Sequence, residues 1–392
     1  MNTLKIGFDA KRAFYNQRGL GNYSRDTIRI LSEQEPGNDY LLFTPKIKNA
    51  IDFPLQSNCK IITPSGSSWT TFSSAWRTFG QCKEIKREKL DIYHGLSHEL
   101  PYGIEKCKVA TVVTVHDLIF LKNPELFPFF DRYTFRKKYT KACKTADKIV
   151  AISQQTKRDL IEYLNMDEGR IEVVYQGCRP VFKQRLDEEA KKAICLKYNL
   201  PSDYMLIVCA IERRKNHEII LKAMHAGKID LPLVIVGRPS EYKNELIRLI
   251  TQYKLESNVI FRYPVETADL PAIYQSATLF VYPSLFEGFG IPILEALTSG
   301  VPVITSKGSC FEETGGNAAC YVAHDDAEEL ADAIRRITEN RELAGQMVEK
   351  GDIHAHLFSD ESIAKALMAV YRDGRLISKY GSPDIAEKYR RN

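Results

Sequence analysis

Two glutamates bracket a glycine-rich stretch in the second half of the chain. Glu287 and Glu295 are separated by seven residues within YPSLFEGFGIPILEALTSG, which follows the apolar run TLFVY. The glycines free the backbone and the proline suits a first helical turn, so we expect a helix to begin near Gly290. The amide groups and positive end of such a helix attract anions. The stretch therefore predicts a diphosphate site at Phe289, Gly290 and Ile291.

Each of these glutamates admits two interpretations. Glu295 lies among apolar residues of the expected helix, where a carboxylate without a partner is costly. It could accept hydrogen bonds from ribose hydroxyls, or it could form a structural salt bridge. Glu287, in the loop before the helix, could contact the hydroxyls of a sugar or be solvated. Because both residues flank one helix start, we favour the ligand-binding interpretation.

A basic triplet follows another apolar run. Arg213, Arg214 and Lys215 come directly after YMLIVCAIE. A guanidinium fork beside an ammonium group is suited to a pyrophosphate, although such a triplet can also be a solvated surface. Taken alone, such a triplet is more often a solvated surface; for a pyrophosphate, Lys215 and Arg214 are the candidate ligands. Arg214 is preferred over Arg213 only because of its place beside the lysine.

Two places in the first half also carry candidate residues. Gly19 and Gly21, in RGLGNY, fall in the expected loop between the first strand and the first helix, where backbone amides can approach a phosphate. This stretch fits the dinucleotide-binding fingerprint poorly and could be only a flexible turn. His116 and Asp117 directly follow VATVVTV, so His116 could hydrogen-bond a sugar or merely cap the strand. We do not assign His116 as a general base.

The strands and helices that position these residues are predicted by short apolar runs that alternate with helical patterns. Two such series indicate two Rossmann-like, doubly wound parallel sheets, an α/β architecture in which ligands bind beyond the carboxyl ends of the strands. Gly177 and Pro180 interrupt the rhythm, so we expect domains at 1–180 and 181–360, followed by helices in 361–392. The expected strands lie in 4–10, 40–45, 60–64, 92–96, 109–118, 148–153 and 171–177, and then in 204–211, 231–237, 258–263, 278–284, 301–306 and 318–323.

Composition narrows the class of protein. The 392 residues include 44% hydrophobic and 27% charged residues, as in a globular protein with enough chain for two domains. No apolar run is long enough to span a bilayer, and the N-terminus does not read as a secretory signal, so we expect a cytoplasmic protein. The net charge of +5 is mild, and we predict no nucleic-acid partner. We find no residue cluster with metal-ligand spacing and predict neither a metal nor a cofactor.

The spacing of the two glutamates, inside PSLFEGFGIPILEA, resembles the E-x7-E motif of retaining GT-B enzymes of glycosyltransferase family 4, also called group 1 glycosyltransferases. The likeness extends along the whole chain. Within this family, the sequence is similar to capsule and lipopolysaccharide mannosyltransferases. It implies two Rossmann-like domains facing a cleft, with C-terminal helices crossing back to the N-terminal domain. The N-terminal domain would bind the acceptor and the C-terminal domain the nucleotide sugar. The resemblance also implies catalytic or donor-binding roles for Glu287, His116, Arg214, Lys215, Gly19, Gly21, Gly237, Val265, Phe289, Gly290, Ile291 and Glu295.

The resemblance implies a reaction and its partners. A hexose would pass with retention, and without metal, from GDP-mannose or a UDP-sugar to a glycan or lipid-linked saccharide of a surface polysaccharide. A nucleotide-sugar epimerase, a catalytically silent glycan-binding protein and a nicotinamide-dependent oxidoreductase are the alternatives. Residues 127–144 interleave six aromatic with six basic residues. Such a segment is either a peripheral contact with the inner face of the membrane or an ordinary amphipathic helix.

Overall fold

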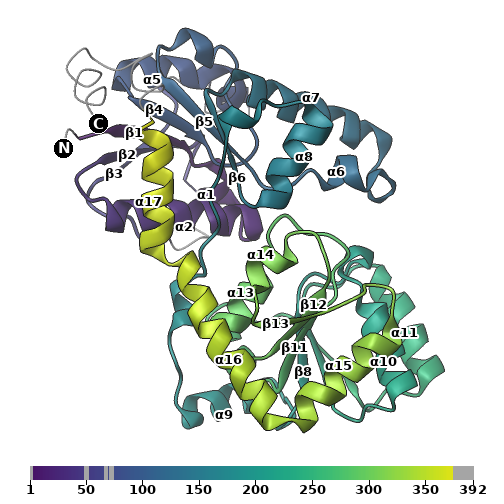
Figure 1. Ribbon diagram of the computed structural model, residues 1–392. Helices are drawn as coiled ribbons and strands as arrows, with labels where there is room; N and C mark the ends of the chain where they lie inside the picture. The colour runs from purple at the N-terminus through teal and green to yellow at the C-terminus, as the bar shows by residue number, and fades with distance from the viewer. Residues whose placement is uncertain (1–2, 48–52, 66–68, 70–74, 374–392) are drawn as a thin grey trace. The chain divides into compact units, whose positions relative to one another are not determined.

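The computed structural model describes residues 3–47, 53–65, 69 and 75–373, and the chain divides into two units (Figure 1). One unit comprises Met1–Gly177 and Asp360–Asn392, and the other comprises Cys178–Ser359. Residues 374–392, part of the segment expected to be helical, lie outside the described residues.

The first unit is built on a parallel sheet with the strand order β3-β2-β1-β4-β5-β6-β7. Its order reverses between β1 and β4, which makes it doubly wound, and helices lie on both faces (Figure 1). Its strands are β1 (Lys5–Asp9), β2 (Asp39–Phe43), β3 (Cys59–Ile62), β4 (Ile92–Gly95), β5 (Ala110–Val115), β6 (Lys148–Ala151) and β7 (Ile171–Val173). Its helices are α1 (Lys11–Tyr15), α2 (Gly19–Gln34), η1 (Trp76–Gly80), α5 (Gln81–Glu88), η2 (Ile104–Lys106), α6 (Ile119–Lys122), η3 (Pro124–Leu126), α7 (Phe129–Thr145), α8 (Gln154–Leu164), η4 (Glu168–Arg170) and α17 (Asp360–Tyr371).

The second unit repeats this architecture with the strand order β10-β9-β8-β11-β12-β13, again parallel throughout. Its order reverses between β8 and β11. Its strands are β8 (Met205–Val208), β9 (Leu233–Val236), β10 (Val259–Arg262), β11 (Leu279–Tyr282), β12 (Val303–Ser306) and β13 (Ala319–Val322). Its helices are η5 (Pro180–Lys183), α9 (Glu188–Lys197), η6 (Arg213–Lys215), α10 (His217–Gly227), α11 (Tyr242–Tyr253), α12 (Leu270–Gln275), α13 (Ile291–Thr298), α14 (Phe311–Gly315), α15 (Ala327–Glu339), α16 (Arg341–Ala355) and η7 (His356–Phe358).

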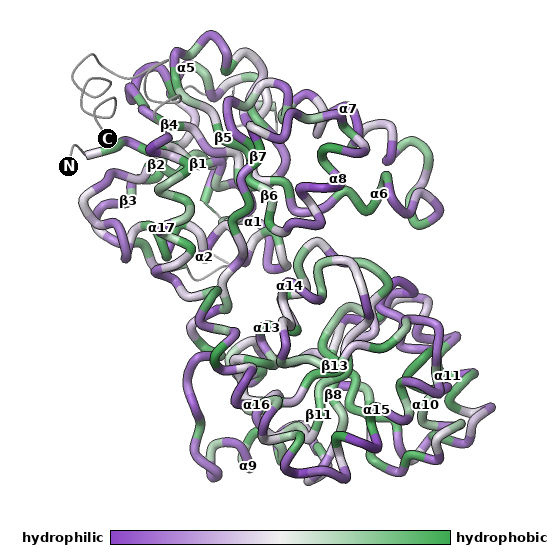
Figure 2. Tube along the Cα trace, viewed as in Figure 1, coloured by the Kyte–Doolittle hydropathy of each residue, from purple (hydrophilic) through white to green (hydrophobic). Residues whose placement is uncertain are grey.

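The apolar strands form because helices cover both faces of each sheet. All six residues of β5, ATVVTV, are buried, and its β-branched side chains suit a pleated surface packed on both sides. The tube coloured by hydropathy shows hydrophobic residues along the central strands of both units (Figure 2). Some helices start at a side-chain cap, as where Ser153 accepts a hydrogen bond from the Thr156 amide at the start of α8. The two predicted doubly wound sheets are confirmed.

Helix α17 returns the chain to the first unit, where it packs against α2 (Figure 1). Asp360 forms an ion pair of 2.9 Å with Arg29 of α2. At the other end, the fully buried Tyr371 hydroxyl lies 2.6 Å from His94 Nδ1 at the centre of the sheet. The predicted return of a C-terminal helix to the N-terminal unit is confirmed.

The prediction that Gly19 and Gly21 lie in a loop after the first strand is wrong. The short helix α1 follows β1, Gly19 opens α2, and Gly21 lies inside α2. A Cβ at Gly21 would stand 1.7 Å from the carbonyl oxygen of Asn16. Close packing of the preceding turn on the helix therefore explains this glycine without a ligand.

Candidate active site

The predicted pyrophosphate and sugar residues of the second unit meet at the reversal of its strand order. The turn η6, with Arg214 and Lys215, follows β8, and the loop containing Glu287 follows the neighbouring strand β11. In doubly wound sheets, this point at the carboxyl ends of the strands is where ligands bind. The topology therefore brings together residues more than seventy positions apart.

One carboxylate oxygen of Glu287 forms the centre of a polar cluster. Arg214 donates to Oε1 over 2.9 Å, and the Lys215 ammonium forms an ion pair with the same oxygen. The Tyr282 hydroxyl accepts a hydrogen bond of 2.7 Å from Lys215 and lies 3.1 Å from Glu287 Oε1. Ser284 Oγ lies 2.6 Å from this oxygen. The sequence analysis missed Tyr282 and Ser284, although both lie in the stretch that it singled out.

The loop that carries Glu287 is fixed to the basic turn through its backbone. The amide of Leu285 donates to the carbonyl of Arg214 over 2.8 Å, and Ser284 Oγ lies 3.0 Å from that carbonyl. The Cys310 thiol donates to the carbonyl of Glu287 over 3.2 Å. Several bonds thus hold the charged side chains in place before any ligand arrives, which lowers the cost of ordering them.

The surroundings of Glu287 and Arg214 favour the charged forms of both groups. Burial opposes ionisation of Glu287, but Lys215 and Arg214 outweigh it and lower the pKa of this carboxyl to about 2. Burial likewise opposes the charge of Arg214, but Glu287 raises the pKa of the guanidinium above its usual value. Arg214 also forms an ion pair of 3.3 Å with the more exposed Glu212, so the two cations face two carboxylates in the free protein. A phosphate group could bind these cations by competing with the carboxylates.

The structure separates the two candidate arginines. Arg213 points to the surface, with 63% of its side chain exposed, and pairs with Glu245 of α11. Arg214 instead lies in the cluster with Lys215 and Glu287. Lys215 is 7% exposed, so the interpretation of the triplet as a solvated surface is wrong for this residue.

Glu295 lies on α13 as expected, but the protein itself occupies its carboxylate. Arg179 donates to Oε1 over 3.0 Å, and the Tyr274 hydroxyl donates to Oε2 over 3.1 Å. Burial raises the pKa of Glu295, against the lowering effects of Arg179 and Tyr274. These contacts form the structural salt bridge that was one of the two interpretations of Glu295. A ribose would have to share the carboxylate with Arg179 or displace it.

The start of α13 has the backbone geometry expected for it. Gly290 precedes the helix with a φ of 89°, a conformation that favours glycine. Pro292 has no amide hydrogen and the Ile293 amide bonds to the Gly290 carbonyl, so these groups do not face a ligand. Phe289 buries its ring against Phe358, with centroids 5.5 Å apart. Only its backbone can serve an anion site.

The remaining second-unit candidates lie beyond other strands. Gly237 follows β9, where an added Cβ would stand 1.7 Å from the Cys209 carbonyl oxygen, so close strand packing explains it. Val265 follows β10, the edge strand of the sheet. Among the described residues, neither Gly237 nor Val265 takes part in the hydrogen bonds and ion pairs of the Glu287 cluster.

His116 follows β5 of the first unit and is buried. Its Nε2 lies 2.9 Å from the carbonyl oxygen of Leu96 and therefore carries the proton. Its ring stands edge-on to Tyr23, with centroids 4.5 Å apart. Burial lowers the pKa of His116 to about 4, which leaves the imidazole neutral near pH 7. A histidine with so low a pKa is a poor general base.

Two families of known proteins match consecutive parts of this chain. Residues 18–180 match the family described as Glycosyltransferase Family 4, and residues 192–354 match Glycosyl transferases group 1. The chain belongs to these glycosyltransferases. Its two doubly wound sheets are the GT-B fold, and the polar cluster of Glu287 lies within the group 1 part of the glycosyltransferase.

Related proteins, and solved structures with a similar fold, match most of the length of this glycosyltransferase. O-antigen chain mannosyltransferase B of Escherichia coli is 25% identical over 386 residues, which span 94% of this chain and 100% of that protein. O-antigen chain mannosyltransferase RfbU of Salmonella typhimurium is 29% identical over 230 residues, 58% of this chain and 60% of that protein. A structure of HepE from Anabaena in complex with UDP superposes with a TM-score of 0.68 at 16% identity, covering 94% and 98% of the two chains.

Helix α7 divides the aromatic residues of the predicted membrane segment into two groups. Phe127, Phe135 and Tyr139 pack against the core formed by β5, β6 and α8. The other three are exposed, which leaves three of the six aromatic residues available for contact with a lipid surface. The exposed residues are Phe129 (71%), Phe130 (81%) and Tyr133 (61%). None of the helices in the described part of the glycosyltransferase has the length and apolar character needed to cross a bilayer.

Proposed function

We propose that this glycosyltransferase moves a mannosyl residue from GDP-mannose to a glycan or lipid-linked saccharide during synthesis of a surface polysaccharide. The names of its relatives support the sugar and the pathway, since two of them are O-antigen chain mannosyltransferases. The observation that carries the proposal is the cluster of Arg214, Lys215 and Glu287 at the strand reversal of the second unit. A UDP-sugar is the other donor that this cluster suits.

The cluster gives each charged group a role in the transfer. Arg214 and Lys215 bind the diphosphate and stabilise the negative charge that grows on it as the glycosidic bond breaks. The backbone amides of Phe289, Gly290 and Ile291, ahead of Pro292, also stabilise this charge. Glu287 orients the two cations in the free protein and accepts hydrogen bonds from the hydroxyls of the bound sugar. Glu295 holds the ribose together with Arg179.

We further propose that the transfer retains the configuration of the anomeric carbon. The acceptor hydroxyl attacks on the face from which the diphosphate departs. Its proton passes to an oxygen of the leaving phosphate, while the bond between the anomeric carbon and that phosphate breaks. His116, with a pKa of about 4, is unsuited to take this proton and instead contacts the sugar. Cations beside the departing phosphate support this course, because they stabilise the phosphate without taking its proton.

The two units divide the substrates in this proposal. The second unit holds the nucleotide sugar, and the first unit holds the acceptor. A radiochemical screen tests the transfer. The protein is mixed with labelled GDP-mannose or UDP-sugars and a saccharide acceptor. Release of nucleoside diphosphate with label in the acceptor supports transfer. Conversion into an isomeric nucleotide sugar marks an epimerase and contradicts it, as does the absence of any turnover.

We also propose a peripheral contact between α7 and the inner face of the membrane. Three exposed aromatic rings beside the basic residues of this helix are suited to an anionic lipid surface. We expect sedimentation with anionic vesicles that weakens at high salt and on Phe130→Ser. Leu196→Ser, at a position of similar exposure (68%) on α9, is the matched control. Equal binding by both variants, or no binding by the unchanged protein, contradicts the contact.

A further inference from the structure

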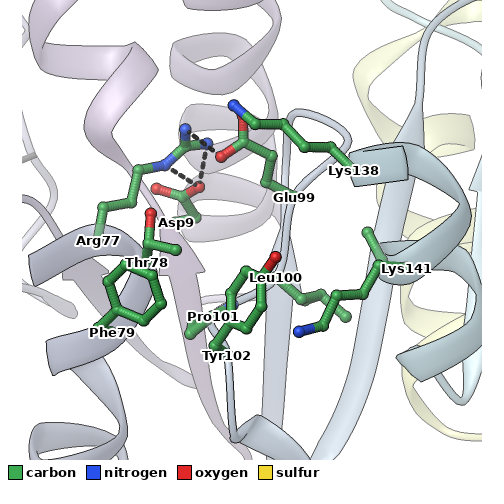
Figure 3. A pocket seen from close by; sticks show the side chains of 11 residues that line it. Asp9, Arg77, Thr78, Phe79, Glu99, Leu100, Pro101, Tyr102, Lys138 and Lys141 are labelled. Carbon is green, nitrogen blue, oxygen red and sulfur yellow. Dashed lines mark hydrogen bonds and ion pairs between the residues drawn. The ribbon is translucent and has the colours of Figure 1, made fainter. Parts of the chain in front are cut away.

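A second charged cluster lies at the strand reversal of the first unit (Figure 3). Asp9 ends β1, and Glu99 follows the neighbouring strand β4. Arg77 of η1 reaches both, with its Nε 2.8 Å from Asp9 Oδ2 and its NH1 2.8 Å from Glu99 Oε2. Arg77 is 7% exposed, and although burial lowers the pKa of Arg77, Asp9 and Glu99 raise it above its usual value.

This cluster forms one wall of a cavity of about 250 Å³. Phe79 and Tyr102 form another wall, with ring centroids 5.2 Å apart and more than two fifths of each residue exposed. Lys141 of α7 holds its ammonium over the Tyr102 ring, and Lys138 extends from the same helix (Figure 3). The volume lies just below the range of roughly 300–1,000 Å³ of drug-sized ligand pockets, so a single sugar ring is of suitable size.

A basic groove shares Lys141 with this cavity. It runs along α7 with a volume of about 540 Å³, and Arg136, Lys137 and Lys144 line it. No carboxylate lines it, and the structure places none within ion-pair distance of these four cations in the described part of the chain. A groove with several cations and no acidic partner favours a phosphate group.

We propose that the cavity binds the terminal sugar of the acceptor and that the groove holds a phosphate through which that sugar, or its chain, is attached. This assignment rests on the proposed function, because it names the acceptor that the first unit would bind. Sugar hydroxyls donate to Asp9 and Glu99 and accept from Arg77. The apolar face of the ring packs on Tyr102, whose π-face is rigid and partly exposed.

A purely structural role for Arg77 explains less of this geometry. A buried ion pair is a weak source of stability, because removing its charges from water offsets most of their attraction. An arginine that merely fastened η1 to β1 would not need a second carboxylate facing an open cavity. The exposed aromatic rings, and the cations with no acidic partner among the described residues, would also remain unexplained.

Binding of small probes to the full-length protein tests the assignment. The probes are the 1-phosphates of glucose, galactose, mannose and N-acetylglucosamine, with inorganic phosphate for comparison, in excess nucleoside diphosphate to occupy the second unit. Titrations are followed by NMR. We expect at least one sugar phosphate to bind, and Lys141→Gln or Tyr102→Ala to weaken it about tenfold or more. Tyr102→Phe keeps the ring and should restore binding.

Lys60→Gln is the matched control, since Lys60 is exposed on β3 and forms a long ion pair of 3.5 Å with Glu88. Three results overturn the assignment: no sugar phosphate binds, inorganic phosphate binds as tightly as every sugar phosphate, or the cavity variants bind like Lys60→Gln. Failure of the proposed function is a different result. In that case nucleoside diphosphates do not bind, or no sugar is transferred, whatever the cavity variants do.

Discussion

Replacing Glu287 by glutamine keeps the shape of this side chain and removes the central negative charge of the active-site cluster. Arg214 and Lys215 would then lose their shared partner, and the buried Lys215 ammonium would retain only the Tyr282 hydroxyl and the glutamine amide oxygen. The same change leaves the two cations more strongly positive toward an added anion. Stability and nucleotide binding should therefore change in opposite directions.

The pKa of Glu287 sets the size of the stability effect. A folded-state pKa of about 2, against an ordinary value of 4.5, corresponds to on the order of 3 kcal/mol in favour of the folded protein. Because the folded-state pKa is the lower one, this stabilisation is fully present above about pH 4.5. It is lost as the pH falls from there toward 2. We expect Glu287→Gln to lower the free energy of unfolding by this order near pH 7 and by less below pH 4.

Urea unfolding at several pH values measures the stability of both proteins. Calorimetry with GDP or UDP and a transfer assay measure function. We expect nucleoside diphosphate binding to be unchanged or tighter, while transfer falls about a hundredfold or more because the sugar hydroxyls lose their acceptor. Glu245→Gln is the matched control, since Glu245 pairs with the exposed Arg213. Nucleotide binding that falls as steeply as transfer would refute the role given to Glu287.

Three further predictions concern the charge and protonation of the site. Lys215→Met should weaken nucleoside diphosphate binding at least tenfold in calorimetry, and it should also lower the stability of the fold because Lys215 is buried. Arg213→Met, at an exposed position, should change binding and stability little. The His116 ring should remain neutral from pH 8 to about pH 5 in NMR titrations, and its lowered pKa should favour unfolding only as the pH falls below its ordinary value of 6.5; protonation near pH 6.5 would contradict the buried geometry. Transfer should survive EDTA, because basic side chains neutralise the leaving diphosphate; loss of activity that Mg²⁺ or Mn²⁺ restores would contradict this.

The strands were predictable because each is a short, continuous apolar run between polar segments. IYHGL and TLFVYPS, for example, contain β4 and β11. Parallel sheets covered on both faces produce such runs, and two series of them indicate two doubly wound sheets. The placement of Lys215 and Glu287 beyond neighbouring strands followed from that topology.

Other features depend on contacts between distant residues and leave no linear signal. Arg179 and Glu295 are 116 positions apart, so their ion pair could not be read from the sequence. The burial of Lys215 comes from folding of the loop around it, and a run of three basic residues does not reveal this. Gly21 was assigned to a loop whose backbone amides could approach a phosphate, yet it lies within α2, where close packing against Asn16 leaves no room for a Cβ. Likewise, the sequence did not reveal which of the six aromatic residues in 127–144 are buried. Phe127, Phe135 and Tyr139 pack against the core and the other three are exposed.

Proton NMR of the first product formed from an α-linked nucleotide sugar and a saccharide acceptor tests the central claim most directly. It reports both whether a glycosidic bond forms and which anomer results. In the proposed mechanism, Arg214, Lys215 and the start of α13 stabilise the departing diphosphate, and no general base acts on the opposite face of the sugar. We therefore predict release of nucleoside diphosphate with an α-linked product. A β-linked product, or an isomerised nucleotide sugar with no new linkage, would contradict the account.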